Sequence, residues 1–261
     1  MLPVYFTAPL INPAPGGLVP AVSWTEQADA PRWLAEGVAF RSSVTGNFGG
    51  EDSTGVWGAS WCASPDDLTE DDLKDGTRPD DLDPFVPVTV WGYDACDLSA
   101  PSQAEVTDRA QQVLRLREPV LLAREFVTRA ETDAGTPTAA DDLVAAVGEL
   151  ESVLADANVV GVIHLAPKLL PALARYNLAQ RTGAGWRSPG GHVLVADGGY
   201  TPVLSDDTML ATSALFGWRT AVEVTTTVKA EHNVFVALAE RSTVIGYEAA
   251  LAAVTITEPT P

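Results

Sequence analysis

The sequence predicts an α+β protein, and three stretches of its 261 residues carry that prediction. The C-terminal run from 221 to 257 is rich in Val, Ile and Thr and alternates in polarity, which is typical of half-buried antiparallel strands. Residues 102–131 carry the longest helical pattern of the chain, and residues 138–157 carry a second amphipathic one. A middle section that alternates strand, helix and strand separates these helices from the C-terminal run.

Four β segments are expected in the C-terminal run, at 222–224, 234–238, 242–246 and 254–257. The polar residues 229–233 connect the first two. Glu240 and Arg241 interrupt the apolar sequence between the second and third segments. Because a charge within a strand is costly unless it is paired, we expect partners for both side chains in another element or another chain.

The first long helix should begin at Ser102, which forms a capping box with Glu105. Pro119 lacks a backbone N–H donor and is expected to kink this helix or split it in two. Intrahelical ion pairs are expected between Glu105 and Arg109 and between Glu125 and Arg129. Five of the chain's cations lie on this helix, and they either meet acidic residues of neighbouring subunits or pair within it: Arg109, Arg115, Arg117, Arg124 and Arg129.

The second helix, 138–157, has one apolar face, formed by Leu143, Val147, Leu150 and Leu154. The middle section that follows predicts a strand at 159–164, a helix at 166–177, a strand at 191–196, a turn at 197–199 and a strand at 208–218.

Residues 1–30 hold five of the 19 prolines and predict an extended arm. Its apolar side chains would be exposed on an isolated subunit, so the arm either clasps a neighbour or folds back on its own subunit. These side chains are Leu2, Val4, Tyr5, Phe6, Leu10 and Ile11.

Residues 37–44 and 55–61 predict a hairpin with a long glycine-rich tip. Residues 66–83 then hold nine acidic against two basic side chains, in an order that does not match a calcium loop. A solvated loop or short helix, capped by Ser64 or Asp66, is the better interpretation. A strand at 85–96, broken at Pro87, leads to the long helix.

The net charge of −19 argues against sequence-independent binding of nucleic acid or anionic lipid, since both require clustered cations.

The only cysteines, Cys62 and Cys96, are expected to be two reduced thiols in or near the core. No signal peptide and no apolar run long enough to cross a bilayer is found, so we expect a chain made in the cytosol that stays soluble or assembles.

His164, at the end of a predicted strand, is the most enzyme-like residue. The chain contains no nucleophile elbow, no phosphate-binding loop, no dinucleotide fingerprint and no zinc-protease motif. His164, His192 and His232 have no metal-ligand spacing. We therefore expect no catalytic, cofactor-binding or metal residues, and a small hydrolase or binding domain that uses His164 is a minor alternative.

The C-terminal motifs resemble those of one family. A strand ending in V-E-V, a polar connection, an N-x-F-x-A-x-A-E-R strand, a strand carrying an aromatic and a terminal A-A-V-T-I-T strand resemble the end of HK97-fold major capsid proteins of tailed bacteriophages. The resemblance implies an N-terminal arm (1–30), an extended loop region (31–84), a peripheral domain with a spine helix and an antiparallel sheet (85–158 and 218–261) and an axial domain (159–217).

It also implies a major capsid protein that self-assembles in hexamers and pentamers into an icosahedral shell in the host cytoplasm. The shell would enclose double-stranded DNA without binding it specifically. Its other partners would be a portal and separate scaffold or decoration proteins. An encapsulin-like nanocompartment shell and a minor or pentamer capsid subunit stay open as alternatives.

Some members of this family join subunits by an isopeptide bond between a lysine and an asparagine, assisted by a glutamate. Here Lys74 lies in the matching region, Asn233 is one residue from the aligned position, and Ala239 occupies the glutamate position beside Glu240. We therefore expect no autocatalytic crosslinking.

Overall fold

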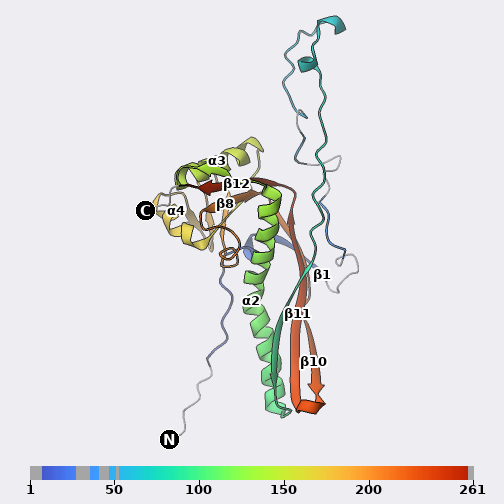
Figure 1. Ribbon diagram of the computed structural model, residues 1–261, viewed down its shortest axis with the longest axis vertical. Helices are drawn as coiled ribbons and strands as arrows, with labels where there is room; N and C mark the ends of the chain where they lie inside the picture. The colour runs from blue at the N-terminus through green and yellow to red at the C-terminus, as the bar shows by residue number, and fades with distance from the viewer. Residues whose placement is uncertain (1–7, 28–35, 41–46, 51–52, 258–261) are drawn as a thin grey trace. The chain divides into compact units, whose positions relative to one another are not determined.

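The computed structural model describes residues 8–27, 36–40, 47–50 and 53–257. The chain divides into a main unit, which runs to residue 38 and resumes at residue 85, and a loop unit of residues 39–84. Among its described residues, the main unit contains two β-sheets, a long helix and two shorter α-helices (Figure 1). The α+β fold class is thus confirmed.

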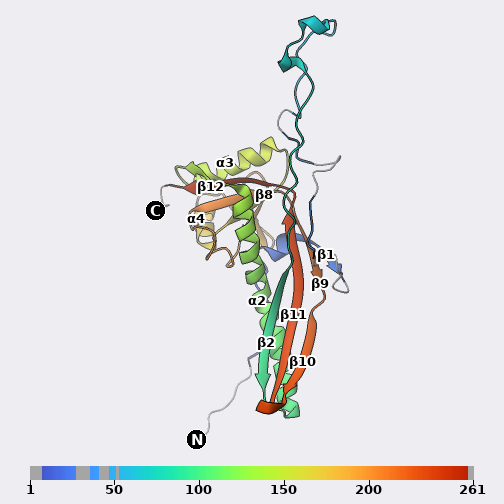
Figure 2. The same ribbon diagram turned by 45° about the vertical axis from the view of Figure 1, so that its right-hand side comes forward.

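The first sheet is built around one long strand, β11 (Figure 2). Its strands follow the order β1 (Val22–Gln27), β9 (Leu215–Thr220), β11 (Val234–Tyr247) and β10 (Glu223–Lys229), and β2 (Val88–Cys96) also pairs with β11. The prediction of two separate strands at 234–238 and 242–246 is wrong, because β11 continues through Glu240 and Arg241 for 14 residues. The first half of β11 lies between β10 and β2, and these three strands form a ribbon.

Helix α2 (Ala100–Ala134) packs along this ribbon. Its buried side chains, including Leu114 and Leu122, contact Ala237 and Ala239 of β11. The helix passes so close to β2 that a Cβ at Gly92 would lie 2.4 Å from the carbonyl oxygen of Ala110. Glycine is therefore required at this crossing.

Two expectations for α2 need correction. The N-cap is Ser99, three residues before the predicted Ser102. Of the kink or split expected at Pro119, the split does not occur, because a single helix of 35 residues contains the proline. Side chains on both sides of the proline, Leu114 and Leu122, are buried against the same sheet, and this packing offsets the lost hydrogen bond.

The second sheet has seven strands and carries helices α3 (Leu143–Asp156) and α4 (Leu170–Arg175) on one face. Its order is β3 (Thr138–Ala140), β12 (Ala250–Ile256), β8 (Thr208–Thr212), β4 (Val162–Leu165), β7 (Val193–Ala196), β6 (Gly185–Arg187) and β5 (Gln180–Thr182). The predicted apolar face of α3 is confirmed as buried. The helix begins later than predicted, because residues 138–140 form β3 and Asp142 accepts a 2.8 Å hydrogen bond from the Ala145 N–H as N-cap.

Besides the passage through α2 from β2 to β3, the chain crosses directly between the two sheets twice, at adjacent places. The segment predicted as one strand at 208–218 is two strands, and Ser213 lies where β8 of the second sheet gives way to β9 of the first. The segment at 254–257, expected beside the other C-terminal strands, instead belongs to β12 of the second sheet. The Ser213 hydroxyl accepts hydrogen bonds from the N–H groups of Glu248 (3.0 Å) and Ala249 (3.2 Å), between β11 and β12, and so joins the two crossings.

The stretch predicted as an arm includes β1, which pairs in parallel with β9. Leu18 is fully buried, and its N–H donates to the Asp197 carboxylate at 2.9 Å. Before Leu18 the chain folds back on its own α2, where Gln112 donates to the carbonyl of Ile11 at 2.8 Å and Arg115 donates to Asn12. The four apolar residues expected at positions 2–6 lie outside the described residues.

The loop unit consists mainly of extended chain and two 3-10 turns, η2 (Pro65–Asp67) and η3 (Glu70–Asp72). The short helix capped by Ser64 is confirmed, because Ser64 and Asp67 form a capping box. The predicted hairpin is not found where it can be checked: residues 55–61 form no strand, and residues 41–44 of the opposing segment lie outside the described residues. A stretch rich in glycine and acidic residues offers too few apolar side chains to hold two strands together.

Candidate functional site

His164 is a core residue. It lies on β4, on the face of the second sheet opposite to α3, and is fully buried. Its Nδ1 is 2.9 Å from the Tyr200 hydroxyl, and its Nε2 is 2.9 Å from the Thr212 hydroxyl. The ring of Phe126 on α2 packs against it with centroids 5.1 Å apart.

The surroundings of His164 keep the imidazole neutral. Burial lowers its pKa from 6.5 to about 3, since a charged ring would lose its hydration. Burial, reinforced by the nearby Asp197 carboxylate, also raises the pKa of Tyr200. With both ring nitrogens engaged and no exposed surface, His164 holds two strands and a loop together.

The other two histidines lie in different settings. His192 is buried and its Nδ1 accepts a 3.3 Å hydrogen bond from the Gly161 N–H. His232 is exposed in the turn between β10 and β11. Among the described residues no group of three or more His, Cys, Asp or Glu side chains could hold a metal ion.

The two cysteines contradict their predicted placement. Cys62 and Cys96 are free thiols, as expected, but both are exposed instead of packed in or near the core. Cys62 lies in the loop unit, and Cys96 is the last residue of β2, where the strand leaves the sheet.

In the described part of the chain, no helix is long and apolar enough to span a membrane.

Arg241 has the partner that the sequence required. Its guanidinium forms a two-pronged ion pair with Glu118 of α2, with 2.8 Å between Arg241 Nε and Glu118 Oε1. Glu240 faces the other way, directly opposite Glu223 of β10 and Trp91 of β2. The face of the ribbon toward α2 therefore carries the ion pair between Arg241 and Glu118. The opposite, outer face carries the carboxylates of Glu240 and Glu223 and the ring of Trp91.

Three of the five arginines of α2 bind partners within the chain, including Arg115, which donates to Asn12, whereas the buried Nε of Arg124 has no hydrogen-bond partner among the described residues. The predicted ion pair between Arg109 and Glu105 is confirmed, with 3.7 Å between the charged groups. Arg109 also binds Asp94 of β2 at 3.0 Å. Arg129 binds Asp133 at 2.7 Å. Arg117 is exposed and binds no carboxylate among the described residues.

Large apolar side chains are exposed in both units. Val56 and Trp61 of the loop unit are 99% and 96% exposed, and Trp91 on the ribbon's outer face is 60% exposed. Leu10, Ile11 and Tyr93 are also exposed. Water contact at so many large apolar groups is unfavourable for an isolated subunit, so these positions are candidate contact surfaces.

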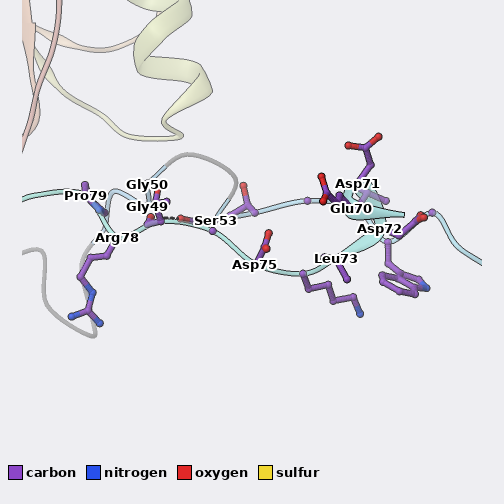
Figure 3. Close-up of a pocket in the computed structure, with 18 of the residues that line it drawn as sticks. Gly49, Gly50, Ser53, Glu70, Asp71, Asp72, Leu73, Asp75, Arg78 and Pro79 are labelled. Carbon is purple, nitrogen blue, oxygen red and sulfur yellow. Dashed lines mark hydrogen bonds between the residues drawn. The ribbon is translucent and has the colours of Figure 1, made fainter. Parts of the chain in front are cut away.

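The loop unit encloses an open hollow of about 1110 Å³ between two extended stretches of chain (Figure 3). The stretches approach closely at Gly50, where a Cβ would lie 1.9 Å from the Thr77 carbonyl oxygen, and Ser53 donates to the same oxygen at 3.1 Å. Acidic side chains, Glu70, Asp71, Asp72 and Asp75, line the hollow, with Lys74 stacked over Trp57 at 4.4 Å.

Within the main unit, the residues considered for a crosslink do not come together. Asn233 is exposed at the turn before β11, with a left-handed backbone (φ 53°). Glu240 lies seven residues farther along that extended strand, about 23 Å away at 3.3 Å per residue. Ala239 is fully buried against α2.

Comparison with protein-family models and with curated proteins finds no match for this sequence. Solved structures do match. A chain of the asymmetric unit of the bacteriophage PhiM1 mature capsid aligns with a TM-score of 0.53 and 10% identity, over 100% of this chain and 92% of that one. A chain from Mycobacterium phage Adephagia aligns with a TM-score of 0.53 and 13% identity, over 100% and 96% of the two chains. A chain from Mycobacterium phage Bobi aligns with a TM-score of 0.51 and 11% identity, over 99% and 96%.

These likenesses establish the architecture. The long helix on a ribbon, the second sheet with its two helices and the extended loop unit together form an HK97-like capsid fold. The fold expected from the C-terminal motifs is thereby confirmed.

Proposed function

We propose that this chain is a major capsid protein that self-assembles, as hexamers and pentamers, into the icosahedral head shell of a tailed bacteriophage. One observation carries the proposal: the likeness to a chain of a phage mature capsid extends over all of this chain and 92% of that one. The protein acts as a structural subunit without catalytic, cofactor or metal residues, in keeping with the burial of His164.

The exposed apolar side chains support assembly. Val56 and Trp61 are almost wholly exposed in a loop unit that is mainly extended chain, and Trp91 is exposed on the ribbon. Neighbouring copies in a shell would cover these groups and gain the free energy of their burial.

The proposed cargo is double-stranded DNA, enclosed without specific binding. A net charge of −19 repels the phosphate backbone, so packed DNA would not adhere to the wall. The further proposed partners are a portal and separate scaffold or decoration proteins, and assembly takes place in the host cytoplasm.

Negative-stain electron microscopy and sedimentation of the expressed chain test this proposal. Closed shells, or rings of five and six, would support it, and nuclease-resistant DNA in shells from infected cells would identify the cargo. Shells filled with a protein would instead indicate an encapsulin-like nanocompartment, and rings of five alone a pentamer subunit. A chain that stays monomeric even with its scaffold and portal would contradict the proposal.

A further inference from the structure

The second sheet and its helices have a strong charge asymmetry along the sequence. Residues 138–156 hold five acidic and no basic side chains, whereas residues 157–196 hold four basic and no acidic ones. Such a basic block stands out in a chain with 35 acidic and 16 basic residues. The two blocks are therefore a candidate pair of complementary surfaces.

The outer strands that carry the two blocks lie at different ends of the strand order, and the blocks meet where Glu151 of α3 accepts a 2.6 Å hydrogen bond from the Gly190 N–H in the turn between β6 and β7. Helix α3, which carries the acidic block, packs over β3, β12 and β8 (Figure 1). The basic residues Arg181 and Arg187 belong to β5 and β6, at the other end of the strand order. Because the ends differ in charge, copies can join head to tail, which closes a ring when the rotation between them is right.

The cations of the basic end are available for a partner. Arg187 donates to the Gly191 carbonyl at 2.6 Å, and Arg181 donates to the Gly183 carbonyl at 3.4 Å and lies over the Trp186 ring. Arg175 lies over the ring of Tyr176. None of the three binds a carboxylate among the described residues, in contrast to Lys168, which binds Asp206 at 2.6 Å.

The outer face of α3 offers matching groups. Glu149 and Asp156 on the helix, and Asp141 just before its N-cap, are exposed and bind no cation among the described residues. Val144, 49% exposed, lies on the same face as Gly148, where an added Cβ would meet no atom within 4 Å. Arginines stacked on aromatic rings, facing carboxylates around an apolar centre, make a chemically complementary contact.

We infer that the basic end of this sheet (Arg175, Arg181 and Arg187) docks on the acidic outer face of α3 (Asp141, Glu149 and Asp156) in the next copy, and that this contact closes the rings of the shell. The inference rests on the proposed function and specifies the surfaces that its subunits use. The partner is a second copy of this chain.

Charge reversal tests the contact. The variant Arg181→Glu/Arg187→Glu should reduce the assembled fraction about tenfold at equal concentration, because attraction becomes repulsion. Adding Glu149→Arg and Asp156→Arg to the same chain should restore assembly, which shows that the first variant failed through charge and not through misfolding. The matched control Arg181→Lys/Arg187→Lys keeps the charges and should assemble nearly as well as the wild type.

Sedimentation velocity and negative-stain microscopy of all four chains supply the readout. If the reversed variant assembles like the wild type, or the fourfold variant fails to recover while circular dichroism shows it folded, the inference is wrong and the proposed function stands. A wild-type chain that forms neither rings nor shells would instead contradict the proposed function itself.

Discussion

Glu118 and Arg241 form an ion pair between α2 and β11, and their side chains are only 8% and 17% exposed. They lie 123 residues apart in sequence, and Glu118 immediately precedes Pro119. The pair therefore ties the long helix to the central strand at the point where the helix lacks one backbone hydrogen bond.

Removing one member of this pair should destabilise the fold strongly. We expect Glu118→Ala to lower the free energy of unfolding by about 3 to 5 kcal/mol, because the Arg241 charge stays buried without a partner. The double variant Glu118→Leu/Arg241→Met should lose much less, since no unpaired charge remains. Urea unfolding of the unassembled chains measures both, and equal losses in the single and double variants would contradict this account.

His164 should make stability depend on pH. Its pKa is lower in the folded chain, at about 3, than the usual 6.5, so the unfolded chain takes up the extra proton as the pH falls below 6.5. This contribution is present above pH 6.5 and should decline by about 2 kcal/mol between pH 7 and pH 5. Urea midpoints of the wild type, His164→Gln and the exposed control His232→Gln measure it. The decline should vanish in the first variant and persist in the second.

Two glycine substitutions should act in opposite directions. At Gly92 a Cβ would lie 2.4 Å from the Ala110 oxygen, so Gly92→Ala should lift β2 from α2 and cost about 3 kcal/mol. At Gly148 on α3 a Cβ meets no atom within 4 Å, so Gly148→Ala should stabilise the helix by up to about 1 kcal/mol. Thermal unfolding compares the two variants, and a stable Gly92→Ala chain would mean that β2 and α2 are less tightly packed.

Assembled particles should dissociate completely in a denaturing detergent. Because Ala239 stands where the C-terminal resemblance would place an assisting glutamate, we expect one band at the chain mass of 27.5 kDa. Gel electrophoresis of boiled particles checks this. A ladder of multiples that disappears in Asn233→Ala would show a covalent link.

The sequence predicted well those features that depend on local pattern. The apolar face of α3 follows from the spacing of Leu143, Leu150 and Leu154, and the capped turn at Ser64 follows from local capping chemistry. The strand beginning at Val88 was also recognisable, and its alternation could have revealed that Trp91 and Tyr93 face away from the helix.

The features it missed depend on residues distant in the chain. Strand β11 continues through Arg241 because Glu118, far away in sequence, neutralises the charge. The division of 208–218 at Ser213 depends on contacts with residues 248 and 249. His164 could not be classified as a core residue until Tyr200 and Thr212 were seen to occupy both of its nitrogens.

The two crossings joined by Ser213 have a mechanical consequence. Both sheets are connected there by two short covalent links that lie side by side, and a single hydroxyl fastens one link to the other. A double link of this kind resists twisting, whereas one strand would act as a swivel. In the proposed shell, internal pressure on the ribbon would therefore rotate the second sheet together with it, and the proposed rings would share that rotation.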